Sequence, residues 1–214
     1  MEGLSVCHSF FSSGYFICFI GNISVVTLFL LWVIKAITFK KYMIMGKKAV
    51  EIVDLDVKKL IEILNQALSE EWLAYYQYWI GARVMSGPMH GEIEKELYKH
   101  ANEELNHAEM LANRIIELDG TPVLSPEDWP HLAKCKYEAP VDAYIESVLK
   151  QNLTSERCAI QRYEMLAKLT DGKDFTTFAI ATQILAEEID HENDIESWLE
   201  DIRVFRESLV AMSV

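Results

Sequence analysis

The chain has 214 residues, half of them hydrophobic and a quarter charged, and its formal net charge is −13. The first 45 residues carry three Lys and one Glu, so the remaining residues have a net charge of −15. This acidic balance argues against DNA binding, because DNA phosphates attract basic surfaces. The length suits one globular domain, residues 46–214, behind an N-terminal segment, residues 1–45.

The N-terminal segment is strongly apolar. No charged residue lies between Glu2 and Lys35, and residues 14–34 are long enough to span a bilayer. A cleaved signal peptide fits poorly, since no Lys or Arg precedes the apolar stretch. Lysines follow it, so a real membrane anchor would leave the domain facing the cytoplasm. Alternatively, Met43 or Met45 is the true start and the preceding stretch is a misassigned part of the gene, which is the alternative we favour.

Four long amphipathic helices are predicted beyond this segment. They cover residues 56–85, 89–118, 141–169 and 174–207. Gly87-Pro88 and Asp171-Gly172 break them into two helical hairpins. Residues 119–140 are irregular and contain Pro, and about 20 residues of chain can run the length of a bundle. The sequence therefore predicts an all-α, up-down-down-up four-helix bundle with a long crossover between the second and third helices.

Two Glu-x-x-His motifs lie 84 residues apart, in the second and fourth predicted helices. They are Glu104-x-x-His107 and Glu188-x-x-His191. A lone glutamate precedes each motif, Glu71 by 33 residues and Glu156 by 32 residues. Residues i and i+3 share one face of a helix, so each motif can present a carboxylate and an imidazole to one metal ion. A single motif of this kind is often only a surface pair, but two in register favour a metal site.

The four glutamates lie within apolar helical stripes, each about 16 or 17 residues from its predicted hairpin turn. Equal distances from the turn place residues at equal height in an antiparallel helix pair. Converging buried carboxylates repel one another and are costly to desolvate, and two cations would remove this cost. The pattern therefore predicts a two-metal carboxylate site in the middle of the bundle.

On these motifs, residues 54–207 resemble the ferritin-like superfamily, and within it Dps-like proteins with a bacterioferritin-type di-iron centre, the thioferritins. Glu71 in Glu-Trp-Leu-Ala-Tyr-Tyr-Gln-Tyr and Glu156 in Glu-Arg-Cys-Ala-Ile-Gln-Arg-Tyr carry the resemblance together with the two Glu-x-x-His motifs. The resemblance implies a ferroxidase that oxidises ferrous iron with hydrogen peroxide or dioxygen. It also implies a homo-dodecameric cage that stores ferric iron and protects against oxidative stress.

The resemblance also implies a role for each site residue. One iron would be bound by Glu71 and His107 and the other by Glu156 and His191, with Glu104 and Glu188 bridging both. Carboxylate and imidazole ligands suit two iron ions, with manganese as the alternative.

Tyr78 and Tyr163 each follow a lone glutamate by seven residues. We expect them to orient the ligands through hydrogen bonds, or else to be ordinary core aromatics.

Two departures from relatives bear on cofactors. Leu105 stands where bacterioferritins carry a haem-ligating Met, so no haem is expected, and the Cys-x-x-Cys module of rubrerythrins is missing.

Cys135 and Cys158 resemble the cysteine pair of thioferritins, which would pass electrons to the site or form a disulfide. Two unrelated buried thiols are the alternative.

Other polar residues near the motifs carry weaker expectations. His100 lies seven residues before His107 on the same face, which suits an auxiliary ligand, an entry route, or a satisfied core or interface histidine. Further acids beside the site are expected on solvated faces or in interface pairs, with a minority lining an iron path. They are Glu70, Glu103, Glu187, Asp190 and Glu192.

The leading hypothesis is a cytoplasmic ferroxidase cage, because few cysteines and no recognisable signal peptide point to a reducing compartment. A membrane-anchored, non-storing di-iron oxidase or peroxidase of the rubrerythrin kind is the alternative if the N-terminal segment is real. A metal-free helical scaffold, whose purpose is assembly, is the third hypothesis.

Overall fold

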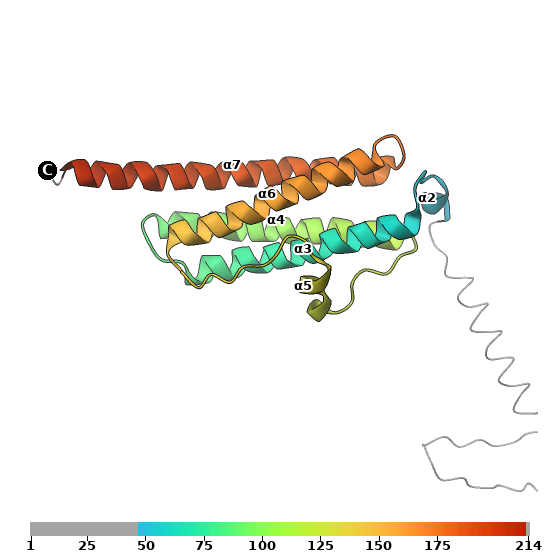
Figure 1. Cartoon of the computed structure of the whole chain (residues 1–214), viewed down its shortest axis with the longest axis horizontal. Coiled ribbons are helices and arrows are strands. Elements are labelled where there is room, and N and C mark those ends of the chain that lie inside the picture. The colour runs from blue at the N-terminus through green and yellow to red at the C-terminus, as the bar shows by residue number, and fades with distance from the viewer. Residues whose placement is uncertain (1–46, 213–214) are drawn as a thin grey trace, which may run out of the picture. The chain divides into compact units, whose positions relative to one another are not determined.

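The computed structural model describes residues 47–212, and most of this part of the chain is helical (Figure 1). The long helices are α3 (Val57–Val84), α4 (His90–Glu117), α6 (Ile145–Thr170) and α7 (Phe175–Met212). The short elements are α2 (Lys47–Glu51), the 3-10 helix η1 (Pro126–Asp128) and α5 (Trp129–Leu132). The predicted up-down-down-up bundle with a long crossover is confirmed.

The apolar stretch at residues 14–34 and the domain boundary at residue 45 lie outside the described residues. Among residues 47–212, no helix is both long and apolar enough to cross a membrane.

Both hairpin turns use backbone conformations that glycine adopts without strain. Gly87, between α3 and α4, has a φ of 142°, and a Cβ there would lie 2.7 Å from Cγ2 of Ile145. Gly172, between α6 and α7, has a φ of 68°. Asp174 then caps α7 by accepting a hydrogen bond from the N–H of Thr177 at 3.1 Å.

The third long helix, α6, begins at Ile145, four residues later than predicted. A short backbone pairing between the end of the crossover and the α3–α4 turn causes the delay. The N–H of Ser86 donates to the carbonyl of Ala143 at 2.8 Å, and the N–H of Ile145 donates to the carbonyl of Ser86 at 2.9 Å. The start of α6 therefore lies beside the α3–α4 turn, and the crossover runs along the bundle.

The last helix, α7, continues to Met212, five residues beyond its predicted end. In Figure 1 this end of α7 projects beyond α6. Ile202 is the last buried residue of α7, and the side chains of residues 203–212 are exposed.

A layer of polar side chains divides the apolar core into two halves. One half includes Leu64, Leu111, Leu166 and Ile184. The other half includes Tyr78, Leu97, Leu149 and Ile195. In each long helix the change from one half to the other occurs at a buried glutamate, so the bundle places four carboxylates at one level.

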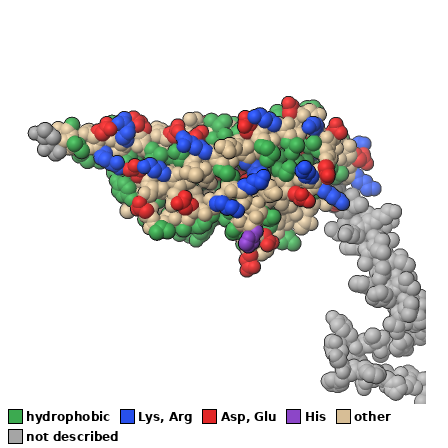
Figure 2. Space-filling model, viewed as in Figure 1, with side chains coloured by type: hydrophobic (Ala, Val, Ile, Leu, Met, Phe, Trp, Pro, Cys, Tyr) green, Lys and Arg blue, Asp and Glu red, His purple; other side chains and the backbone are tan. Residues whose placement is uncertain are grey.

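On the face shown in Figure 2, basic and acidic side chains are interspersed rather than segregated.

Candidate metal centre

Each long helix contributes one glutamate to the polar layer. These are Glu71 of α3, Glu104 of α4, Glu156 of α6 and Glu188 of α7. All four are at most 2% exposed, and His107 and His191 are at most 3% exposed. The six residues singled out from the sequence therefore lie together in the interior, which is a costly arrangement unless positive charge is also present.

The six side chains form two overlapping groups that share Glu104 and Glu188. One group adds Glu71 and His107, and the other adds Glu156 and His191. Within each group the potential ligand atoms lie within 4.8 Å of one another. This division has the form expected for two bridging glutamates, Glu104 and Glu188, that contact both ions, and two terminal glutamates, Glu71 and Glu156, that each contact one.

Both histidines face the shared glutamates with Nδ1. Nδ1 of His107 lies 3.1 Å from Glu104 and 3.3 Å from Glu188. Nδ1 of His191 lies 3.2 Å from Glu104 and 3.5 Å from Glu188. The two imidazoles therefore approach the same pair of carboxylates, and Nδ1 of each histidine is the ligand nitrogen that its group offers to a metal ion.

The terminal glutamates resist ionisation. Burial, and then the charge of Glu188, raises the pKa of Glu156 well above its ordinary value. Burial is also the main cause of the raised pKa of Glu71, although the contact of Glu71 with His107, at 3.5 Å, opposes the rise. The centre therefore carries more negative charge than its own environment tolerates, and bound cations would relieve this.

The shared glutamate Glu104 behaves differently. Burial acts to raise its pKa, but hydrogen bonds and charge from His107 and His191 outweigh burial and lower it. Burial likewise acts to lower the pKa of both imidazoles, but their hydrogen bonds to the surrounding glutamates raise it above the ordinary value. Protons on the two imidazoles thus supply the positive charge that metal ions would replace.

Several buried atoms at the centre have ion-pair contacts but no well-aligned hydrogen bond. They are Oε2 of Glu71, Oε1 of Glu104, both carboxylate oxygens of Glu188 and Nδ1 of His191. Buried polar atoms are nearly always satisfied in proteins, so this cluster requires an explanation. Oxygen and imidazole donors of this kind fit iron or manganese.

The two tyrosines predicted to orient ligands contact the terminal glutamates crosswise. The hydroxyl of Tyr78 on α3 donates to Glu156 of α6, and the hydroxyl of Tyr163 on α6 donates to Glu71 of α3. Both rings are fully buried. Each tyrosine therefore holds the glutamate of the helix opposite its own.

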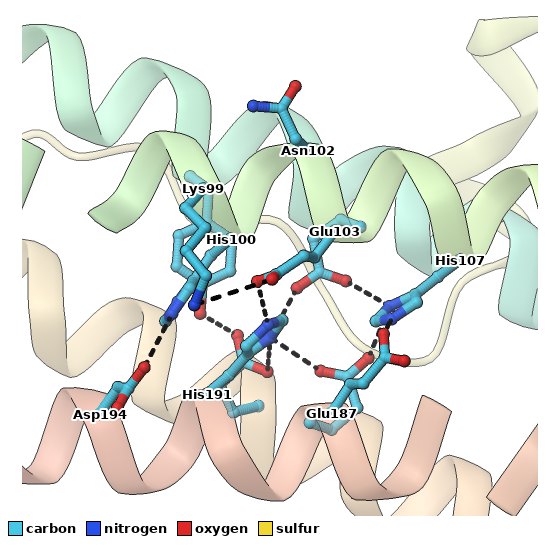
Figure 3. A network of polar contacts seen from close by, with 12 residues as sticks. Lys99, His100, Asn102, Glu103, His107, Glu187, His191 and Asp194 are labelled. Atoms are coloured by element: carbon cyan, nitrogen blue, oxygen red, sulfur yellow. Dashed lines mark hydrogen bonds and ion pairs between the residues drawn. The ribbon is translucent and has the colours of Figure 1, made fainter. Parts of the chain in front are cut away.

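Glu103 and Glu187 were expected mainly on solvated faces or in interface pairs, and their side chains are indeed 36% and 35% exposed, but both also contact the histidines of the centre. Nε2 of His107 donates to Glu187 at 2.8 Å, and Nε2 of His191 donates to Glu103 at 3.0 Å (Figure 3). Each carboxylate holds the outer nitrogen of a histidine from the other helix, which leaves Nδ1 facing inward. A sequence signal existed, because the two glutamates are themselves 84 residues apart, as the motifs are.

Glu70 was expected on a solvated face or in an interface pair, and it is buried within the bundle instead. Its carboxylate accepts two hydrogen bonds from Arg162, at 2.6 and 2.7 Å, and one from the N–H of Lys134 at 2.7 Å. Glu70, the residue next to Glu71 on α3, therefore holds the crossover and α6 against α3. Nearby, Cys135 of the crossover and Cys158 of α6 form a disulfide.

His100 is fully buried, and its ring stacks on that of His191 with centroids 4.1 Å apart. Burial, and then the charge of His191, lowers the pKa of His100 to about 4. The ring is therefore neutral near pH 7. Asp190 and Glu192 also lie on α7, but they are not members of either four-residue group.

The family model for the ferritin-like domain matches residues 61–205. The chain belongs to the ferritin-like family. Members of this family are generally ferroxidases with di-iron centres, so membership supports ferroxidase-type chemistry and iron storage in broad terms.

Two curated relatives of this ferritin-like chain cover most of its domain. The DNA protection during starvation protein of Pyrococcus furiosus is 37% identical over 159 residues, which are 73% of this chain and 83% of the relative. The bacterioferritin of Brucella melitensis is 28% identical over 143 residues, 66% of this chain and 83% of the relative.

Solved structures show the same fold. The dodecameric thioferritin of Bacteroides fragilis, a bacterioferritin-related protein, is 54% identical with a TM-score of 0.75, covering 76% of this chain and 98% of that one. An archaeal Dps homologue from Halobacterium salinarum has a TM-score of 0.64 at 23% identity, over 68% of this chain and 81% of that one, and shows the fold alone.

Proposed function

We propose that this ferritin-like protein is a ferroxidase that oxidises ferrous iron at the candidate centre, stores the ferric product in a homo-dodecameric cage and so protects against peroxide. The observation that carries the proposal is the pair of overlapping ligand groups that share Glu104 and Glu188 in the buried core. A shared pair of carboxylates holds two ions side by side, which is what a two-electron oxidation requires.

Ferrous iron is the substrate, and the residues of the centre prepare it for paired oxidation. Two ferrous ions would displace the protons of His107 and His191 and take over their charge-balancing role. Hydrogen peroxide then takes one electron from each ion; its O–O bond breaks, two protons are taken up and two water molecules leave. Removing the electrons as a pair avoids the hydroxyl radical that a one-electron reduction of peroxide releases.

Several parts of the proposal go beyond the family assignment. The donor set fits iron and manganese alike, and iron is proposed because a bacterioferritin and a thioferritin are among the relatives. Hydrogen peroxide or dioxygen as the oxidant is part of the same proposal. The homo-dodecamer is supported by the dodecameric thioferritin that is 54% identical to this chain. A cytoplasmic site of action is part of the same proposal. DNA contact is not, because the chain beyond residue 45 has a net charge of −15.

The deciding experiment follows ferrous oxidation from an anaerobic start, first with peroxide and then with dioxygen, and measures particle mass on the same sample. Glu104→Ala should abolish rapid oxidation while the helical content is retained. Glu109→Ala is the matched control, because Glu109 is exposed on the same helix. An unchanged rate in Glu104→Ala would refute the site.

The same measurement separates the alternatives. Slow oxidation by a monomer or dimer would favour a non-storing di-iron enzyme. Purified protein that binds neither iron nor manganese would favour a structural scaffold.

A further inference from the structure

The side of α7 that faces the bundle carries a stripe of side chains at alternate steps of three and four residues, from Ala181 to Met212. Residues at these steps lie on one face of a helix. The members of the stripe from Ala181 to Ile195 are at most 3% exposed, and they include the Glu-x-x-His motif of the candidate centre. Ile202 continues the stripe and is 2% exposed. The stripe is therefore the face by which α7 packs against the other helices.

The same stripe continues beyond the end of the bundle, and there its apolar side chains are exposed. Phe205, Leu209 and Met212 occupy its last three positions, and they are 48%, 47% and 75% exposed. Figure 1 shows this end of α7 projecting beyond α6. The pattern that buries α7 thus stays the same where the bundle ends, although the exposure changes.

The opposite face of the projecting end is charged. Arg203 donates hydrogen bonds to Glu200 and Glu207, which lie one turn before it and one turn after it. An apolar face and a charged face are typical of a helix that packs on a partner along one side. Ion pairs within a helix stabilise it only slightly, and short helices depend on packing for most of their stability. The last three turns of α7 therefore require an apolar partner.

The charges on either side of the stripe indicate a second copy of the chain as that partner. Asp201 lies on one flank of the stripe and Arg206 on the other. Arg206 pairs with Glu146 at the start of α6, and its side chain is 54% exposed. When identical copies follow one another around an axis, one flank of each copy meets the other flank of the next. Acidic and basic flanks then face each other, so the surface is complementary to itself.

Other partners suit this surface less well. DNA and anionic lipids attract basic surfaces, and the chain beyond residue 45 has a net charge of −15. A second copy brings the same apolar stripe, and the proposed homo-dodecamer places copies next to one another. The observations therefore favour a contact between subunits.

We propose that residues 203–212 of α7 pack against a second copy of the chain and bury Phe205, Leu209 and Met212 between subunits. This inference rests on the proposed cage, and it identifies one of the surfaces that build it. Since α7 also carries Glu188 and His191, the helix that completes the candidate centre would also join the subunits.

The test compares the particle mass of full-length wild type with that of Leu209→Glu by light scattering. A charge within the stripe should lower the mean particle mass at least about twofold. Leu209 is half-exposed in the single subunit, so the variant should keep its helical content and its Co²⁺ binding at the candidate centre. Glu207→Lys is the matched control, because it makes a larger change of charge on the opposite face of the same turns. It should keep the wild-type mass.

Hydrogen exchange of assembled wild type is a second measurement, and it needs no variant. The amides of residues 203–212 should exchange about as slowly as those of residues 195–202, whereas a helix end without a partner frays and exchanges much faster. A dodecamer whose mass is unchanged in Leu209→Glu would overturn the contact and leave the cage standing. Fast exchange of residues 203–212 in that dodecamer would do the same. Wild type that does not assemble would overturn the cage together with the contact, and would leave the ferroxidase centre to be judged by its own oxidation rate.

Discussion

Oε2 of Glu187 on α7 lies 2.8 Å from Nε2 of His107 on α4, and this contact fixes which nitrogen of the histidine faces the centre. Burial acts to raise the pKa of Glu187, but hydrogen bonds from His107 and Gln183 outweigh it and lower the pKa. Glu187 is therefore a charged acceptor at pH 7 that holds the imidazole in place from outside.

Glu187→Ala should weaken metal binding beside His107 by about 10- to 100-fold, the usual cost of losing such a partner. Anaerobic Co²⁺ titration followed by absorbance measures this, and Glu187→Gln should recover part of the loss because its amide oxygen still accepts a hydrogen bond. Glu196→Ala, at a half-exposed position on the same helix, should bind Co²⁺ as wild type does. Equal affinity in Glu187→Ala and wild type would contradict a positioning role.

The crossed tyrosines lead to a second prediction. Tyr163→Phe removes the hydroxyl that donates to Glu71, whose other oxygen already lacks a hydrogen bond. A buried acceptor left without its donor costs about 1–3 kcal/mol, so metal-free protein should be less stable by that amount. Tyr78→Phe should behave alike, because Tyr78 has the same relation to Glu156. Urea unfolding of both variants measures the loss, and two unaltered midpoints would show that the tyrosines only fill space.

Much of the centre could be predicted from the sequence because its ligands follow helical periodicity. Glu104 and His107 share one face of one helix, and the lone glutamates lie at matching distances from turns marked by Gly87 and Gly172. These are local relations, which a single helix determines.

Contacts between helices were harder to predict. Glu103 lies one residue before a ligand, and periodicity alone turns it away from the centre. It reaches His191 only because α4 and α7 pack side by side. The start of α6 depends on the pairing of Ser86 with the crossover. Such contacts join segments that are far apart in the sequence, and no local sequence pattern predicts them.

The disulfide between Cys135 and Cys158 gives a third prediction. It closes a segment with a sequence separation of 23 residues and attaches the crossover to α6. A loop of this size predicts a contribution of about 3 kcal/mol to stability. Cys135→Ser and reduced wild type should therefore unfold at similarly lowered urea concentrations, with free thiols counted to confirm the redox state. If the oxidised and reduced proteins unfold at the same midpoint, the bond does not stabilise the bundle.

The fourth prediction concerns the end of the bundle where α6 joins α7, and where Asp174 pairs with Arg114. Both side chains are 1% exposed, and Nη2 of Arg114 lies 2.9 Å from each carboxylate oxygen. Burial acts to raise the pKa of Asp174, but hydrogen bonds from Thr177 and Arg114 outweigh it and lower the pKa. A lowered folded-state pKa means that this pair stabilises the protein fully above the unfolded value, about 3.9 for Asp.

That stability should be lost as the pH falls from about 4 through the lower, folded-state pKa of Asp174. Asp174→Asn should cost about 3–5 kcal/mol at pH 7, because Arg114 is left buried without its main partner, and should flatten the acid dependence below pH 4. Thermal unfolding of metal-free protein across this pH range measures both effects. Asp128→Asn, at an exposed position, should retain the wild-type acid profile. An Asp174→Asn profile as steep as that of wild type would assign the acid sensitivity to other carboxylates, above all to those of the centre.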